Sequence, residues 1–285
     1  MKASAPIGLI GLGLVGGALA GRLQRARFRV VGFDVDAAQR WALGKLGGHP
    51  AGSAAEVFAA CDRVLLSLPN SNVVESVLRG AAPQVRRGLR IIDTTTGDPD
   101  ATARLGAGLA RRGVRYLDAT IVGSSAQVRA GDVLMLVGGR RADFVAARDV
   151  FATFAKQSFH TGPCGSGARM KLVVNLVLGL NRAVLAEGLA FARSLGVSQK
   201  DALKILKAGA AYSRIMDTKG GKMIAQDFTP QAKLSQHLKD VRLMLAASSI
   251  PLPLSRTHRK LLEKAEALGF GEADNSAIIE AFFNP

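Results

Sequence analysis

The sequence predicts an α/β fold, a doubly wound parallel sheet followed by an all-helical C-terminal domain. Between Ile7 and about Thr161, short apolar runs alternate with helical stretches, a pattern typical of parallel sheets. After Gly162 the strand pattern stops and helical periodicity takes over. The 285 residues, 48% hydrophobic and 21% charged, are sufficient for two folded domains.

Six apolar runs are the candidate strands. Runs such as Val64–Leu66 and Ile91–Ile92 lack alternation of apolar and polar residues, as expected for strands that helices cover on both faces. In chain order the six runs read IGLIG, RVVGFD, RVLLSLP, RIIDTTT, RYLDATI and VLMLVGG.

The first turn carries a glycine pattern between a strand and an Ala/Leu-rich helix that ends near Leu23. The first glycine permits a tight turn, the second lets a pyrophosphate approach the backbone, and the third lets helix and strand pack closely. Unpaired N–H groups of the helix start suit anionic oxygens. The pattern predicts a Rossmann-type dinucleotide-binding domain over residues 1–163, with a cofactor-binding turn made of Gly11, Leu12, Gly13, Leu14, Val15 and Gly16.

Asp34 ends the second strand and predicts the cofactor. It follows Gly11 by 23 residues, close to the usual separation of about 20, and its carboxylate can accept both ribose hydroxyls. A carboxylate there repels the 2'-phosphate of NADP, so NAD is favoured. NADP stays open because Arg40 can bind that phosphate, and the alternative role for Asp34 is the N-cap of a helix from Ala37.

A long helix follows the run Gly162-Pro163-Cys164-Gly165-Ser166-Gly167 and extends to about Leu195. Residues 164–195 are apolar nearly all round, which predicts a buried helix between the two domains. Lys171 and Asn175 lie four residues apart on one face, where an amine and an amide can meet one small polar substrate. Lys171 would exchange a proton with a carbonyl or alcohol, and burial near a cationic ring would lower its pKa. The alternative is a lysine that extends to solvent and an asparagine bonded in the core.

Four blocks stand in a characteristic order: GLGLVG, LSLPNS, GPCGSGARMKLVVN and LKDVRL. With them the chain resembles the β-hydroxyacid dehydrogenases, the group containing 3-hydroxyisobutyrate dehydrogenase, from Ile7 to at least Leu243. The resemblance implies NAD(P)-dependent hydride transfer, with Lys171 as catalytic acid/base and Asn175 in support. It also implies that Leu68, Pro69, Asn70 and Thr96 line the cofactor, that Lys239 approaches the nicotinamide end, and that Asp240 stabilises its surroundings.

The substrate loop departs from that family. Members usually read Asp-Ala-Pro-Val-Ser-Gly-Gly where this chain has Asp118 to Ser124, so Val122 replaces the substrate-binding serine. Ser124 or Ser125 can supply a hydroxyl, and backbone N–H groups around Gly123 can hold an anion. An aromatic residue common near Ala232 is also missing. The expected substrate-binding set is Val122, Gly123, Ser124, Lys171 and Asn175.

Residues 196–285 are expected to form an all-helical substrate and oligomerisation domain. The resemblance implies a homodimer or homotetramer. The expected helices are a Ser198-capped segment to Lys207, Gln231–Ala247, Pro253–Leu268 and Asn275–Phe283.

Charge and composition limit the kinds of partner that can be expected. The net charge of +16 attracts anions, but the basic residues form small groups near turns, which favours a solvated surface over a nucleic-acid interface. No membrane span is expected, because Asn175 interrupts the apolar stretch Leu172–Leu180. The presence of only two cysteines fits a reducing cytoplasm, and the four histidines have no ligand-like spacing, which predicts no metal site. Glycines in the opening run disfavour a secretory signal peptide there.

The function these features predict is hydride transfer between a nicotinamide cofactor and a small anionic substrate, a short β-hydroxy acid or its semialdehyde. Two alternatives remain: an imine reductase-like enzyme, suggested by the altered loop, and a non-catalytic NAD-sensing protein. Lys171 argues against the first, because imine reductases that resemble this chain generally replace that lysine. Lys171, Asn175 and Lys239 together argue against the second.

Overall fold

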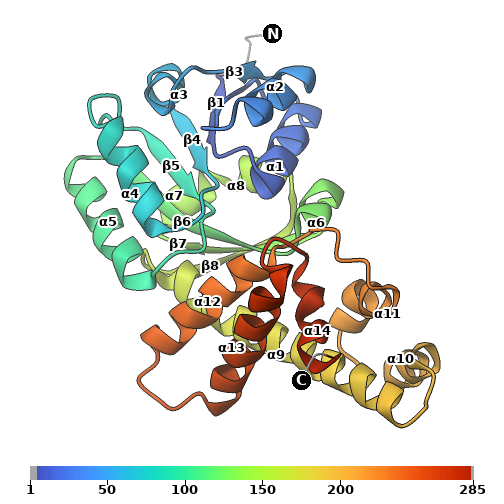
Figure 1. Ribbon diagram of the computed structural model, residues 1–285. Helices are drawn as coiled ribbons and strands as arrows, with labels where there is room; N and C mark the ends of the chain where they lie inside the picture. Colours follow the sequence, from blue (N-terminus) through green and yellow to red (C-terminus); the bar gives the residue numbers. More distant parts are fainter. Residues whose placement is uncertain (1–4, 284–285) are drawn as a thin grey trace. The chain divides into compact units, whose positions relative to one another are not determined.

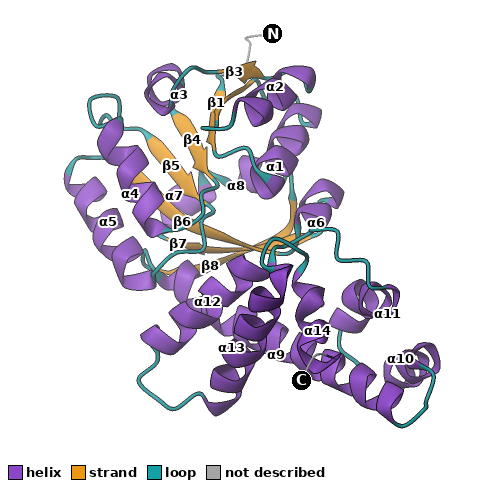
Figure 2. Ribbon diagram, in the orientation of Figure 1, coloured by secondary structure: helices purple, strands orange, loops and turns teal. Residues whose placement is uncertain are grey.

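The computed structural model describes residues 5–283. It consists of two compact units, the first ending at Lys171 and the second beginning at Leu172 (Figure 1). All strands of the described residues lie in the first unit, and the second unit is helical (Figure 2). The predicted α/β class with an all-helical C-terminal part is confirmed.

The first unit contains one sheet in the order β3-β2-β1-β4-β5-β6-β7-β8. The pairs from β3 to β6 are parallel, as predicted, whereas β7 runs antiparallel to β6. The connection of residues 123–132 is too short for the crossover that a parallel pair needs. The strands are β1 (Ile7–Ile10), β2 (Val30–Phe33), β3 (His49–Pro50), β4 (Arg63–Leu66), β5 (Arg90–Asp93), β6 (Arg115–Val122), β7 (Val133–Gly138) and β8 (Ala155–Gly162).

The six predicted strands are present, and two others were missed. Strand β3 is only a two-residue strand at one edge of the sheet. Strand β8 lies at the other edge, and its residues are exposed or half-buried, so it lacks the apolar run of a buried strand.

Helices cover both faces of this sheet. One apolar core joins α1, α2, α6, α7 and α8 to the strands, through side chains such as Leu19, Val128 and Phe151. The other joins α3, α4 and α5, through Phe58, Val74 and Leu109. The helices of this unit are α1 (Leu14–Arg25), α2 (Ala37–Lys45), α3 (Ala54–Ala60), α4 (Ser71–Gly80), α5 (Pro99–Arg111), α6 (Ser125–Ala130), α7 (Arg141–Val145) and α8 (Arg148–Phe151).

Helix α9 (Ser166–Ser194) starts in the first unit and continues into the second, whose core includes Leu185 and Leu189 from it. The Ser198 cap is confirmed, since its hydroxyl accepts from Asp201 N. The second unit further contains α10 (Gln199–Ala208), η1 (Met216–Gly220), α11 (Gly221–Ala225), α12 (Leu234–Ala247), α13 (Pro253–Ala265), η2 (Glu266–Phe270), η3 (Asn275–Ile279) and α14 (Glu280–Phe283).

The predicted helix start at Gln231 is wrong, because α12 begins at Leu234. The N–H groups of Gln231 and Ala232 instead donate to the carboxylate of Asp274, which holds this segment as a loop. Residues 216–225, missed from the sequence, form a π-helical turn and a short helix, η1 and α11.

We expect His258 to make the protein less stable in acid. Its side chain is buried against His237, and burial, followed by the charge of Arg182, lowers its pKa to about 4. The native state therefore keeps the imidazole neutral, while the unfolded chain binds a proton below the ordinary pKa of 6.5. The free energy of unfolding should fall by about 1.3 kcal/mol from this group between pH 7.5 and 5.5.

Urea unfolding of the wild type and His258→Gln at both pH values measures this contribution. The variant should lose less stability on acidification than the wild type, and equal losses in the two proteins would contradict the assignment.

Candidate functional site

The cofactor-binding residues expected from the sequence follow the carboxyl ends of parallel strands. The glycine turn follows β1, Asp34 follows β2, Leu68 follows β4 and Thr96 follows β5. Strand β1 lies between β2 and β4. The chain adds β2 and β3 on one side of β1 and then crosses to add β4 and β5 on the other side. In open α/β sheets, ligands bind outside the carboxyl ends of the strands at such a point. The topology therefore places these residues together outside the carboxyl ends of the parallel strands.

The glycine turn shows two kinds of constraint. Gly11 has φ +90°, and a Cβ there would lie 2.2 Å from the Ser67 carbonyl oxygen. A Cβ on Gly16 would lie 1.9 Å from the Gly11 carbonyl oxygen, so both glycines are required by packing. Gly13 faces open space, and no side chain of the described residues caps α1. The uncapped helix start with an open glycine fits a pyrophosphate, whose oxygens would accept from its N–H groups.

Asp34 is tied to this turn. Its Oδ2 accepts from Leu12 N at 2.6 Å, and its Oδ1 accepts from Asp36 N at 2.9 Å. The alternative role of Asp34 as helix N-cap is wrong, because Asp36 caps α2 through a bond from Ala38 N. Arg40 Nη1 donates to the carbonyl oxygens of Asp34 and Val35. A carboxylate held beside the glycine turn suits a ribose diol.

The loop after β4 is held by the loop after β5. Leu68 N donates to Thr95 Oγ1 at 3.2 Å, and Asp98 N donates to Ser71 Oγ at 2.9 Å. Asn70 caps α4 by accepting from Val73 N. Thr95 was missed from the sequence because only the fold brings the two loops together. These bonds fix the backbone of Leu68–Asn70, which the resemblance assigns to the cofactor.

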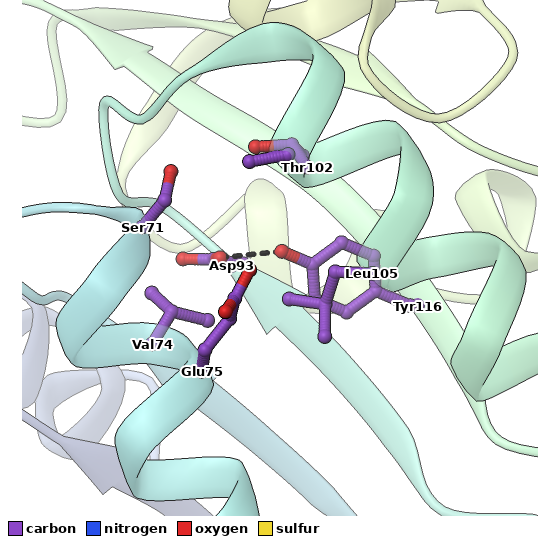
Figure 3. A pocket seen from close by; sticks show the side chains of 8 residues that line it. Ser71, Val74, Glu75, Asp93, Thr102, Leu105 and Tyr116 are labelled. Carbon is purple, nitrogen blue, oxygen red and sulfur yellow. Dashed lines mark hydrogen bonds between the residues drawn. The ribbon is translucent and has the colours of Figure 1, made fainter.

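A small pocket beside these loops contains a buried acid. Ser71, Glu75, Asp93, Thr102 and Tyr116 are among its lining residues, and the Tyr116 hydroxyl donates to Asp93 Oδ2 at 2.5 Å (Figure 3). Burial raises the pKa of Asp93 and of Tyr116. Asp93 Oδ1 also accepts from Thr95 N. The pair thus anchors the loop that supports Leu68.

Lys171 is buried, with 7% of the residue exposed, and its Nζ donates to the Ile121 carbonyl oxygen at 2.6 Å. The alternative in which this lysine extends to solvent is therefore wrong. Ile121 belongs to β6, which contains residues 118–122 of the expected substrate loop, and only Gly123 and Ser124 lie beyond the strand. Helix α9 and strand β6 thus bring the amine and this loop together within the first unit.

The substrate loop is closed by a local capping box. Gly123 has φ +149°, the Ser124 hydroxyl accepts from Gln127 N, and Gln127 Oε1 accepts from Ser124 N at 3.0 Å. The Ser124 N–H is thus engaged, so an anion could use it only by displacing the Gln127 amide. Gln127 was missed because its role depends on the start of α6. Val122, Gly123 and Ser124 are all half-buried.

A separate cluster of polar side chains lies in the second unit. Asn175, on α9, is 5% exposed, and its Nδ2 donates to Asp240 Oδ2 at 2.8 Å. Lys239 Nζ lies 3.2 Å from Asp240 Oδ1. Asp240 therefore joins the two residues of this unit that the resemblance assigns to the active site.

Two sequence families account for most of the chain. Residues 6–162 match the NAD binding domain of 6-phosphogluconate dehydrogenase, and residues 165–282 match the NAD-binding region of NADP-dependent 3-hydroxyisobutyrate dehydrogenase. The chain belongs to the β-hydroxyacid dehydrogenase family. It is an NAD(P)-dependent oxidoreductase of that family, as the sequence resemblance indicated.

Known proteins support this assignment over nearly their whole length. Glyoxylate/succinic semialdehyde reductase 1 of Arabidopsis thaliana is 30% identical, covering 96% of this chain and 97% of the relative. A 3-hydroxyisobutyrate dehydrogenase of Mycobacterium tuberculosis, solved with L-serine, has a TM-score of 0.87 at 25% identity, covering 97% and 98%. An imine reductase of a Pseudomonas species shares the fold with a TM-score of 0.69 at 21% identity, covering 97% and 99%.

Residues 5–283 contain no group of three or more His, Cys, Asp or Glu side chains arranged to hold a metal ion. Within the same residues, α9 alone is long and apolar enough to cross a membrane. Core helices of soluble proteins share these properties, and nearly half of the most apolar stretch of α9 is buried.

Proposed function

We propose that this dehydrogenase transfers a hydride between NAD and a short β-hydroxy acid or its semialdehyde, with Lys171 as the general acid/base. The observation that carries the proposal is the buried Lys171 amine beside the substrate loop, in the unit that holds the dinucleotide-binding turn. When bound, the nicotinamide gives or accepts the hydride.

Lys171 handles the proton in this proposal. An ammonium has three N–H donors, and one is directed to the Ile121 carbonyl oxygen. In the reductive direction another donates its proton to the carbonyl oxygen of the substrate, and in the oxidative direction the neutral amine accepts the alcohol proton. Asn175 supports the substrate or the amine from the next turn of α9.

The loop argues for a small anionic substrate with an altered binding mode. Val122 offers no hydroxyl where the family has serine. We therefore assign to the substrate the hydroxyl of Ser124 and the side-chain N–H groups of Gln127, which lies in the first turn of α6. The relative in Arabidopsis thaliana is named for glyoxylate and succinic semialdehyde, both short oxo acids. We assign the same chemical class to this chain.

An imine reductase-like activity and a non-catalytic NAD-sensing role are the competing functions. The higher structural similarity to a hydroxyacid dehydrogenase favours the first proposal over the imine reductase. The placement of Lys171 beside the substrate loop favours an enzyme over a sensor.

The test is the initial rate of NADH oxidation with a panel of short semialdehydes, 2-oxo acids and cyclic imines. Turnover of an oxo acid or semialdehyde supports the proposal. Turnover of imines alone would establish the imine reductase, and tight NADH binding without turnover of any member would favour the sensor.

We also propose NAD as the preferred cofactor, because the Asp34 carboxylate lies beside the glycine turn and Arg40 is engaged with backbone carbonyls. Asp34→Asn keeps an oxygen that can accept from Leu12 N but removes the negative charge. We expect the ratio of kcat/KM for NADH over NADPH to fall about tenfold, because repulsion of the 2'-phosphate is lost. Arg40→Ala is the control, since removing this cation should not improve use of NADPH, and an unchanged ratio in Asp34→Asn would contradict the assignment.

A homodimer or homotetramer in a reducing cytoplasm completes the proposal. Five apolar residues spaced four, seven, seven and four apart are exposed along or just beyond α9: Val173, Val177, Val184, Phe191 and Leu195. Such a stripe suits packing against a second copy. Cys61 and Cys164 are free thiols, as a reducing compartment allows. Light scattering of the purified protein measures the assembly.

A further inference from the structure

The start of α9 is held by a side chain from a strand that lies nearly 50 residues earlier in the chain. Asp118, on β6, is 1% exposed, and its Oδ2 accepts from Gly165 N at 3.0 Å and from Ala168 N at 2.9 Å. The first N–H groups of a helix have no partner inside the helix, so an outside carboxylate can satisfy them. We propose that Asp118 is a positioning residue for Lys171, acting by capping α9 from strand β6. This inference rests on the proposed role of Lys171.

Strand β6 holds the same helix at two further points. Thr120 Oγ1 donates to the Gly167 carbonyl oxygen at 3.2 Å, and the Ile121 carbonyl oxygen accepts from Lys171 Nζ at 2.6 Å. Contacts from three residues of one strand therefore reach the beginning, first turn and second turn of α9. The same strand contains residues 118–122 of the expected substrate loop, so it sets the position of the amine relative to that loop.

Close packing makes this arrangement rigid. A Cβ on Gly167 would lie 2.6 Å from the Asp118 carbonyl oxygen and 2.7 Å from the Leu136 carbonyl oxygen. Glycine at this position lets the helix start approach β6 and β7 closely enough for the Asp118 cap. The glycine-rich run before Lys171 thus has a packing role in this chain.

The oxygen acceptor of Asp118, more than its charge, is what the cap requires. Asp118 lies opposite Asp93 in the parallel register of β5 and β6, and burial raises the pKa of Asp118 to about 7. Burial thus disfavours a negative charge on this group. Asparagine has the same shape and one oxygen that can accept both N–H groups, so it should preserve the cap.

Three variants and one control test the inference in the full chain. Asp118→Ala removes the cap, Asp118→Asn keeps its acceptor, and Thr120→Val removes the neighbouring bond at constant shape. Ser53→Ala removes the cap of α3, whose hydroxyl accepts from Glu56 N, and is the matched control for loss of a helix cap away from Lys171.

The readout that a purely structural role would not change is the rate at which acetic anhydride acylates Lys171, measured over a range of pH. Mass spectrometry quantifies the acylated lysine. In Asp118→Ala and Thr120→Val the acylation rate should rise several-fold, because the amine leaves the Ile121 carbonyl. We expect kcat on the active panel substrate to fall about tenfold or more in Asp118→Ala, with NADH affinity unchanged. Asp118→Asn and Ser53→Ala should stay close to the wild type in both measurements.

The inference is overturned if Asp118→Ala does not change the acylation of Lys171, or if Ser53→Ala changes it equally. It is also overturned if Asp118→Asn behaves as Asp118→Ala does, because charge would then be the requirement. Should Asp118→Ala fail to fold, Asp118→Ser takes its place, because its shorter side chain withdraws the acceptor from the Gly165 and Ala168 N–H groups. If the wild type turns over no panel member, the proposed function fails, yet the acylation comparison still decides the positioning role.

Discussion

Lys171→Ala should lower kcat by about three orders of magnitude on the substrate that the panel identifies. The variant removes the proton donor or acceptor next to the substrate loop, and no water-exposed lysine can take its place because this position is buried. NADH binding should stay within about twofold of the wild type, since most of the proposed cofactor contacts come from the loops at the carboxyl ends of the parallel strands. Stopped-flow absorbance of NADH and fluorescence titration measure the two quantities.

Two controls separate chemistry from packing in this experiment. Lys171→Met keeps a long side chain in the buried position and should be as inactive as the alanine variant. Lys200→Ala removes an exposed lysine on α10 and should leave kcat unchanged. A Lys171→Met protein that keeps more than a tenth of the wild-type kcat would show that another group carries the proton.

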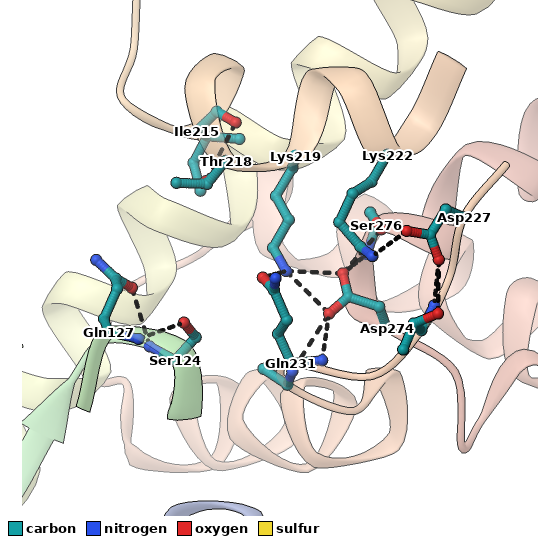
Figure 4. A network of polar contacts seen from close by, with 12 residues as sticks. Ser124, Gln127, Ile215, Thr218, Lys219, Lys222, Asp227, Gln231, Asp274 and Ser276 are labelled. Carbon is teal, nitrogen blue, oxygen red and sulfur yellow. Dashed lines mark hydrogen bonds and ion pairs between the residues drawn. The ribbon is translucent and has the colours of Figure 1, made fainter. Parts of the chain in front are cut away.

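Asp274→Ala should cost the second unit about 3–5 kcal/mol of folding free energy. Asp274 is fully buried, and its two carboxylate oxygens lie 2.7 and 2.9 Å from Lys219 Nζ (Figure 4). It also accepts from the Gln231 and Ala232 N–H groups and from the Ser276 hydroxyl. The alanine variant leaves the Lys219 cation buried without its counter-charge and frees the loop before α12.

The buried guanidinium of Arg182 increases this cost. Arg182 is 2% exposed, and its Nε and Nη1 have no hydrogen-bond partner among residues 5–283. Burial lowers its pKa to about 10, and the charge of Asp274 opposes this shift. One carboxylate therefore compensates two buried cations. Urea unfolding of Asp274→Ala and Lys219→Met measures the effect. Lys219→Met should cost less, because Asp274 keeps its backbone and Ser276 donors, and a loss below about 1 kcal/mol in Asp274→Ala would contradict this account.

Most elements of the first unit could be predicted because their causes are local. Apolar runs such as Val64–Leu66 form strands that helices cover on both faces, and six such runs became β1, β2, β4, β5, β6 and β7. Gly11 and Gly16 could be interpreted from the turn alone, and their packing agrees with that interpretation. The edge strands β3 and β8 could not, because an edge strand needs no continuous apolar run.

For the candidate site, residue positions were predictable but their supports were not. The spacing of Lys171 and Asn175 placed both on one helix, and Asp34 was placed at the end of β2. The supporting roles of Thr95, Gln127 and Asp118 were not predicted, because each acts on a backbone group that only the fold or a helix start brings near. The catalytic, cofactor and substrate roles themselves remain predictions for the experiments above.

The sequence by itself determined the α/β class, the dinucleotide turn, the family and the one-turn spacing of Lys171 and Asn175, because periodicity, glycine freedom and helix geometry act over a few residues. Only the tertiary structure decided that Asp118 caps α9, that Ile121 accepts from Lys171 and that Asp274 holds Lys219. These contacts join groups that are 47 to 55 residues apart in the chain, so no local pattern encodes them. They form because burial makes an unpaired N–H group or charge costly until the fold supplies a partner.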